Sequence, residues 1–197
     1  MPPPFPLTPT SAAGDPFCTD PYCDPPQEGN SITVCSTFVP PFEIDGGYAP
    51  LALNVEGLEA SVTSVEVTIS FTKPGRFGGY PPAFFTYNSE IFFYLYSPED
   101  NFDPETFYSD GPGMYILYDG SITGQYAETV SGTLTFGDQY AAPYDADSVI
   151  SGNYQPGDPF SIFNGQSGNG IWYLLVGDNS PPDPLLINSC CITVSSL

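Results

Sequence analysis

Apolar and polar residues alternate along Ser61–Thr72, which reads SVTSVEVTISFT. The apolar positions are Val62, Val65, Val67, Ile69 and Phe71, and the polar positions between the last four are Glu66, Thr68 and Ser70. Because a period of two places alternate side chains on opposite faces of a strand, this stretch is predicted to be a strand with one face on a core and one face toward water.

Six other runs rich in aromatic and β-branched residues predict further strands. They are Ser31–Val39, Glu90–Ser97, Met114–Tyr118, Thr129–Phe136, Ile171–Val176 and Leu185–Val194. Segments rich in Gly, Pro, Asn and Asp separate most of these runs, and no helical periodicity of any length interrupts them. We therefore expect an all-β fold, an antiparallel β-sandwich. Its predicted core is Val65, Val67, Ile69, Phe71, Ile91, Phe93, Leu95, Trp172, Leu174 and Val176.

The amino-terminal segment has a different composition. Nine prolines fall between positions 2 and 26, and they favour an extended polyproline II conformation. Phe5, Leu7, Phe17 and Tyr22 are scattered apolar residues that no local structure would bury. We divide the chain into an extended arm, residues 1–31, and a sandwich domain, residues 32–197. The arm is expected to bind a neighbouring subunit through these four residues; packing on its own sandwich is the alternative.

Charge excludes several classes of function. The chain of 197 residues has 23 Asp and Glu, 2 Lys and Arg and no His, a formal net charge of -21. Nucleic acids and anionic membranes are bound through Lys and Arg, so neither is an expected partner. Without His there is no Ser-His-Asp or Cys-His pair. No apolar run is long enough to span a bilayer, and we expect Met1 to be the native start, without a signal peptide.

Five cysteines leave at least one thiol unpaired within the chain. Cys18 and Cys23 flank a short loop that a disulfide could close. Cys35 could pair with Cys190 or Cys191, and only one of these two neighbours can face the core. Buried reduced thiols are the alternative. Zinc is not expected, because the spacing is wrong and no His completes a set.

Residues 151–194 resemble the P domain (P/Homo B domain) of subtilisin-like proprotein convertases and its stand-alone bacterial relatives. The matching pieces are S-G-x-Y-x-P at Ser151–Pro156, F-N-G at Phe163–Gly165 and N-G-x-W at Asn169–Trp172. Upstream, VTSVEVTISFT, EIFFYLYSPED and SGTLTFGDQYAAP resemble three other stretches of that family, in the same order. The family's histidine after the first of these is absent, its G-D-L is Ser89-Glu90-Ile91, and its D-D is Gly137-Asp138.

The resemblance implies a jelly-roll sandwich without chemistry of its own. It also implies Ca²⁺ held by loop carboxylates, for which the candidates are Asp138, Asp145, Asp147 and Asp178. Carboxylate oxygens suit this hard cation, but Asp is also common in turns for its local hydrogen bonds. A carboxylate pair such as Asp145 and Asp147 has the groups a glycosidase needs, yet two acids without a predicted cleft are a poor signal.

Three functions remain. The first is a non-enzymatic structural subunit of a large assembly, which we expect to be a virion decoration or cement protein or another capsid or tail accessory. It would be homo-oligomeric and would bind protein subunits with a more basic surface. The second is an extracellular or cell-surface structural protein with a Ca²⁺-binding sandwich. The third is a carbohydrate- or peptide-binding module, which exposure of Trp172 would favour.

Overall fold

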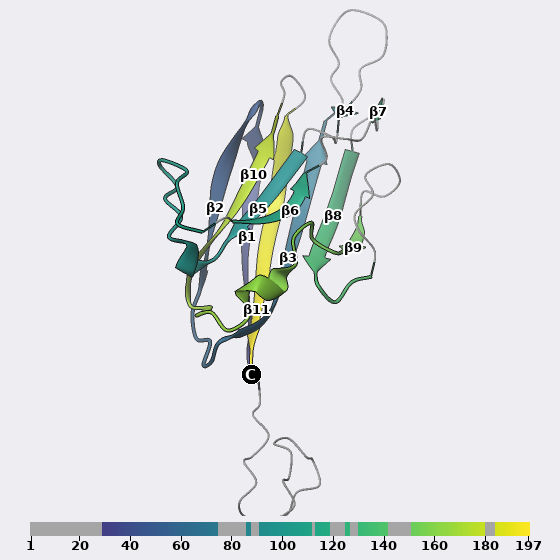
Figure 1. Ribbon diagram of the computed structural model, residues 1–197. Helices are drawn as coiled ribbons and strands as arrows, with labels where there is room; N and C mark the ends of the chain where they lie inside the picture. Colours follow the sequence, from purple (N-terminus) through teal and green to yellow (C-terminus); the bar gives the residue numbers. More distant parts are fainter. Residues whose placement is uncertain are drawn as a thin grey trace, which may run out of the picture.

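The described part of the chain forms two β-sheets packed face to face (Figure 1). The computed structural model describes residues 29–74, 86–87, 91–111, 113–118, 125–126, 130–141, 151–179 and 184–197. One sheet has the strand order β1-β11-β3-β8-β9 and the other has the order β2-β10-β5-β6. The predicted all-β sandwich is therefore confirmed.

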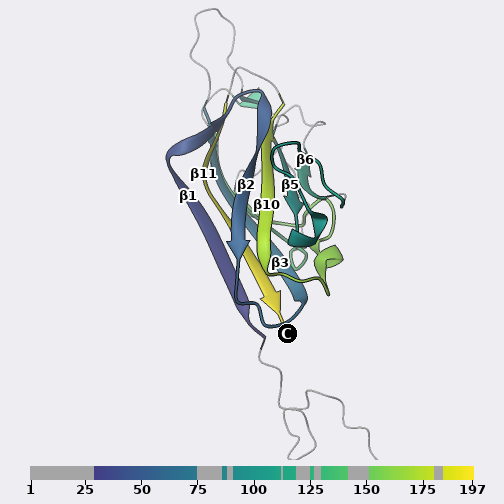
Figure 2. The ribbon, with the colours of Figure 1, turned by 90° about the vertical axis from the view of Figure 1, so that its left-hand side faces the viewer.

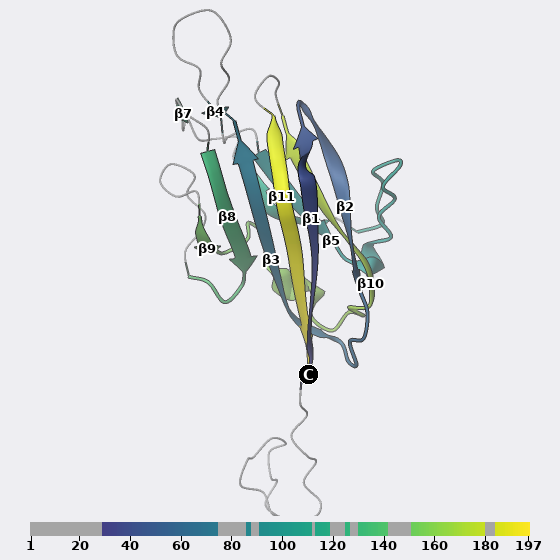
Figure 3. The ribbon, with the colours of Figure 1, turned by 180° about the vertical axis from the view of Figure 1, so that it is seen from behind.

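The strands of the five-stranded sheet are β1 (Ser31–Ile44), β3 (Val62–Lys73), β8 (Val130–Gly137), β9 (Gly152–Tyr154) and β11 (Leu185–Ser196). β1, β3 and β11 are the longest of the described strands. β11 pairs with β1 on one side and β3 on the other, both antiparallel, and Figure 3 shows these three strands side by side. β9 pairs parallel to β8, so the expectation of a purely antiparallel sandwich is wrong at this edge.

The four-stranded sheet is antiparallel in all three of its pairings. Its strands are β2 (Gly47–Val55), β5 (Ile91–Tyr96), β6 (Met114–Tyr118) and β10 (Gly170–Asp178). Two short strands, β4 (Thr86–Tyr87) and β7 (Gln125–Tyr126), pair separately. Two short 3-10 turns, η2 (Pro98–Asp100) and η3 (Phe160–Phe163), lie in the connections.

The core lies between the sheets and contains every residue predicted for it. Each of the ten predicted side chains is at most 3% exposed. β3 and β10 contribute alternate residues from opposite sheets, as the period-two pattern requires. Phe160 and Phe163 of η3 join this core.

Four strands were not predicted, β2 and the short β4, β7 and β9, and β1 is longer than expected. β1 continues past Val39 through Pro40 and Pro41 to Ile44, with a register shift between Thr37 and Phe42. Because β1 is an edge strand, its prolines remove no ladder hydrogen bond that a second neighbour would need. The turn after Ile44 leads into β2, which forms the edge of the other sheet beside β1 (Figure 2).

Both ends of the described sandwich domain lie together. The Ser196 N–H donates to the Asn30 carbonyl at 2.9 Å, and the Asn30 side-chain amide donates to the Gly57 carbonyl at 2.8 Å. The chain therefore enters β1 beside the end of β11, at the end of the sandwich marked C in Figure 1. None of the helical segments among the described residues is both long and apolar enough to cross a membrane.

Candidate protein-binding face

Aromatic rings gather on the outer side of the four-stranded sheet. They belong to Tyr48, Phe92, Tyr94, Tyr96, Phe102, Phe107 and Tyr173, and we call this set the aromatic face. β-strand alternation explains the set, because Tyr173 and Leu175 of β10 point away from the core that receives Trp172 and Leu174. Tyr173 lies opposite Tyr96 of β5, and Leu175 lies opposite Tyr94.

Phe102 is the centre of the aromatic face and comes from the loop after β5. Its ring stacks on Tyr96 at a centroid distance of 4.3 Å and meets Tyr173 at 5.2 Å. Phe107 of the same loop lies 6.3 Å from Phe102 and makes an edge contact with Tyr48 at 4.7 Å. One loop thus carries two rings across the outer side of β5, β10 and β2.

The loop is held in shape by its own acidic residues. The Asp100 carboxylate accepts from the Ser97 N–H at 2.7 Å, and the Asp103 carboxylate accepts from the Thr106 hydroxyl at 2.6 Å. The Thr106 hydrogen bond, followed by that from the Glu105 N–H, lowers the pKa of Asp103. These acids therefore act as turn formers, and they position Phe102 and Phe107.

The aromatic face is only partly covered. Phe92, Phe102 and Leu175 are buried at its base, whereas Tyr48 is 53% exposed and Phe107 is 39% exposed. Tyr108 of the loop is 66% exposed nearby in sequence. Burial raises the pKa of Tyr96, with smaller contributions from Tyr94 and Asp100. Exposed aromatic surface of this kind is typical of a site that binds protein or another apolar partner.

Close packing on this face explains why a glycine stands at position 177. A Cβ at Gly177 would lie within 1.9 Å of the Phe92 ring, so the glycine lets that ring lie against β10. Any larger residue here would displace Phe92 from the base of the aromatic face. The strand therefore carries a glycine where a ring approaches its backbone closely.

Asp178, predicted as a loop ligand for Ca²⁺, is instead the last residue of β10 and is fully buried. Its carboxylate accepts from Lys73 Nζ at 2.9 Å, and both side chains are 0% exposed. Lys73 ends β3, so this ion pair joins the two sheets. The expected loop position of Asp178 is wrong, and its carboxylate serves the buried pair.

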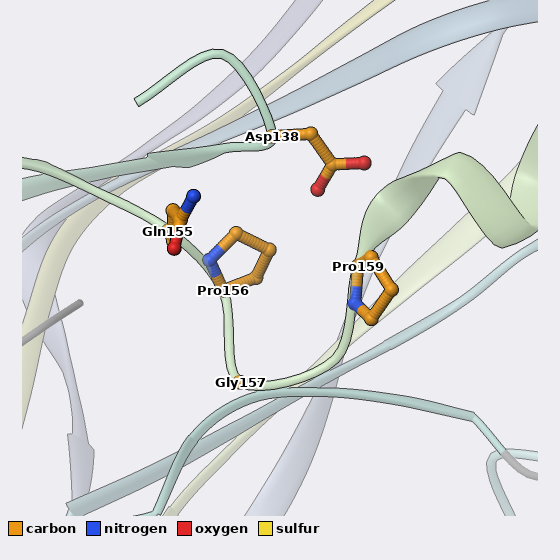
Figure 4. Close-up of a pocket in the computed structure, with 5 residues that line it drawn as sticks. All are labelled: Asp138, Gln155, Pro156, Gly157 and Pro159. Atoms are coloured by element: carbon orange, nitrogen blue, oxygen red, sulfur yellow. The ribbon is translucent and has the colours of Figure 1, made fainter. Parts of the chain in front are cut away.

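Asp138 occupies a turn after β8, as expected, and it organises η3. Its two carboxylate oxygens accept from the Phe160 N–H at 2.8 Å and the Ser161 N–H at 2.6 Å. Asp138 also borders a hollow of about 330 Å³ lined with Gln155, Pro156, Gly157 and Pro159 (Figure 4). The carboxylate is thus committed to backbone donors, which is the turn role weighed against Ca²⁺ binding.

The other two calcium candidates, Asp145 and Asp147, lie outside the described residues. Within the part that is described, no three His, Cys, Asp or Glu side chains are grouped as a metal site requires. The structure does not bring Asp138 and Asp178 into one such group. A calcium site therefore stays a prediction that rests on the family resemblance.

Trp172 is in the core and not on the surface. It is 0% exposed, its Nε1–H donates to the Gly168 carbonyl at 2.9 Å, and its ring meets Phe163 edge-on at 5.1 Å. A carbohydrate platform built on Trp172 is therefore wrong. The rings of β5 that the same platform would have used, Phe92, Tyr94 and Tyr96, lie on the outer face, as alternation along β5 could have shown.

A disulfide joins Cys35 of β1 to Cys191 of β11, directly opposite in the register. Of the two pairings considered, the structure has the one with Cys191. Cys190 faces the core as a free thiol, and burial raises its pKa to about 11. Such a thiol is a weak nucleophile in the folded protein. Cys18 and Cys23 lie outside the described residues.

Replacing both Cys35 and Cys191 with Ser is expected to lower the free energy of unfolding by about 2–4 kcal/mol. The bridge spans 156 residues of sequence, so its loss frees a large loop in the unfolded chain. Chemical denaturation at equal protein concentration measures the change. A Thr33→Ser variant is the control, because Thr33 lies on the same strand and its hydroxyl bonds that of Thr193. A double variant as stable as the native chain would contradict this prediction.

The predicted partner-binding residues of the arm, Phe5, Leu7, Phe17 and Tyr22, lie outside the described residues. The arm was assigned to residues 1–31, and β1 begins at Ser31. Every strand of the two described sheets therefore comes from Ser31 onward.

Comparison with known proteins identifies no family. No family model matches the chain, and no curated protein matches it. Among solved structures, the crystal structure of FLHE is similar over 85% of this chain and 96% of that chain, at 10% sequence identity and a TM-score of 0.37. The resemblance to P domains thus stays a prediction from the sequence motifs.

Proposed function

We propose that the protein is a non-enzymatic structural subunit of a large assembly, in the manner of a virion decoration protein or another capsid or tail accessory. The observation that carries this proposal is the partly exposed aromatic face on a disulfide-bonded sandwich. Large exposed apolar patches are rare on proteins that act alone and mark interaction surfaces. Tyr48 and Phe107, in edge contact and partly exposed, are suited to act as anchors there.

Charge supports a protein partner with the opposite potential. Lys73 is buried in its ion pair, so the described surface presents no Lys or Arg at all. With a formal net charge of -21, the chain would approach a basic surface of its assembly by electrostatic steering. Attachment should then weaken as salt rises, because a Debye length of about 10 Å at 0.1 M screens such contacts.

An extracellular or cell-surface structural protein is the second candidate, and the Cys35–Cys191 disulfide is the observation that favours it. Disulfides persist in oxidising surroundings, which include both cell surfaces and virion surfaces. The two candidates therefore share the same sandwich and the same binding face. They differ in the assembly that incorporates the protein.

Deleting residues 1–28 is expected to leave the sandwich folded and to abolish its incorporation into the assembly. The described strands begin at Ser31, and Asn30 keeps its bonds to Ser196 and Gly57 in such a chain. Co-sedimentation with purified particles from the source measures incorporation, and thermal unfolding measures the fold. A control chain with Pro25 and Pro26 changed to Ser keeps the full length of the arm.

Two results would contradict this proposal. Full incorporation of the truncated chain, together with a lower melting temperature, would show that the arm stabilises its own domain. A native chain that sediments alone at every salt concentration would remove the proposed assembly altogether.

A further inference from the structure

We propose that the aromatic face is the receptor for the proline-rich segment Pro2–Pro9 of a second copy of this chain. This inference rests on the proposed function, since it names the contact by which copies would be linked. The segment reads PPPFPLTP. The face is defined above by seven aromatic residues on β2, β5, β10 and the loop after β5.

The chemistry of the aromatic face suits such a segment. Proline-rich peptides in the polyproline II conformation dock on aromatic-lined surfaces, where pyrrolidine rings pack against aromatic rings and little chain entropy remains to be lost. Phe102 stacks on Tyr96 and Phe107 meets Tyr48 at 88°, so the rings present both flat surfaces and edges. Leu175 and Phe92 close the base of this surface.

The negative charge of the loop favours binding of this segment over binding of most other segments of the chain. The loop that carries Phe102 and Phe107 also carries Glu99, Asp103 and Glu105, and these repel an acidic partner. The arm has no acidic residue before Asp15. Its first part therefore approaches the loop without like-charge repulsion, although the chain as a whole is strongly acidic.

The place where the arm joins the domain favours a second copy. Asn30 continues the β1–β11 ladder by accepting from the Ser196 N–H, at the end of the sandwich. An arm that bound its own aromatic face would have to reverse the direction of β1 before reaching Asn30. A polyproline II chain of 28 residues would extend about 87 Å, whereas the nine residues of β2 span about 30 Å. An extended arm would therefore be longer than this strand of the sandwich and could reach a neighbouring copy.

The test mixes two full-length variants in sedimentation velocity experiments. The face variant carries Tyr48→Ser and Phe107→Ser, and the arm variant carries Pro4→Ser, Phe5→Ser and Pro6→Ser. Each alone is expected to self-associate at least roughly tenfold more weakly than the native chain, since loss of aromatic anchors of this kind costs at least one decade in affinity. An equimolar mixture is expected to regain association but to stop at dimers, because only one arm and one face remain intact in each pair.

Matched controls separate this contact from general effects of substitution. Val39→Ser changes a side chain that is 92% exposed on β1, outside the aromatic face, and should associate as the native chain does. The Pro25→Ser, Pro26→Ser variant changes the arm outside Pro2–Pro9 and should also associate as the native chain does. Circular dichroism spectra and melting temperatures confirm that both test variants are folded.

Three results would overturn the inference. A face variant that associates like the native chain would show that the rings do not bind the arm. A mixture that stays monomeric would show that arm and face do not meet between copies, and a monomeric native chain would show the same. Incorporation of the native chain into particles despite any of these results would leave the proposed function standing and remove only this contact.

Discussion

A Trp172→Ala variant is expected to unfold with a free energy about 3–5 kcal/mol lower than that of the native chain. The indole is 0% exposed and packs edge-on against Phe163 in the middle of the core. Its removal loses apolar burial, leaves a cavity and deprives the Gly168 carbonyl of its Nε1–H donor. Urea denaturation followed by circular dichroism measures the loss.

Ile171→Ala provides the matched control for this experiment. Ile171 is the preceding residue of β10, but it points to the outer side and is 44% exposed. Its truncation should cost less than about 1 kcal/mol. Equal losses for the two variants would mean that the register of β10 differs from the one described.

The second large effect is expected at the buried ion pair. Asp178→Asn removes the carboxylate that Lys73 Nζ contacts at 2.9 Å, and Lys73→Met removes the ammonium that Asp178 contacts, both in the protein interior. Each single change should lower the free energy of unfolding by about 3–5 kcal/mol. The double variant Lys73→Met, Asp178→Leu should recover much of that loss, since replacing both charges removes the need to desolvate either.

A double-mutant cycle made of Lys73→Met, Asp178→Leu and the double variant gives the interaction free energy between the two side chains directly. Glu66→Gln is a control on the same strand, because Glu66 is half-buried and accepts hydrogen bonds from Gln139 and Tyr140 at the sheet surface. Losses that simply add in the double variant would contradict a direct interaction between Lys73 and Asp178.

The alternation of apolar and polar residues predicted the core, because the geometry of a strand places successive side chains on opposite faces. Val65, Val67, Ile69 and Phe71 of β3 face inward and are buried, as are Trp172, Leu174 and Val176 of β10. The same period continues to Lys73 and Asp178, which occupy the next inward positions of β3 and β10. Neither was predicted to face inward, because the predicted strands ended at Thr72 and Val176 and Asp178 was expected in a loop.

Other features depended on tertiary contacts that a single sequence does not contain. β2 was not among the predicted strands although Leu51, Leu53 and Val55 alternate, and its Pro50 and the flanking glycines are residue types that also occur in connections. Phe102 and Phe107 lie in a segment with strong turn residues, so their place against Tyr96 and Tyr48 follows from how the loop folds back. The choice of Cys191 over Cys190 likewise required the register of β11 against β1.

The disulfide also determines how the domain would resist a pull on the arm. Because Asn30 and Ser196 lie together, tension on the arm would peel β1 from β11 one residue pair at a time, as a zipper opens from its end. The pairs at Ser31, Ile32, Thr33 and Val34 would separate first, and the fifth pair is Cys35 with Cys191. A covalent bond there stops the peeling after four pairs. A subunit held by its arm could thus bear mechanical load while the rest of the sandwich stays intact.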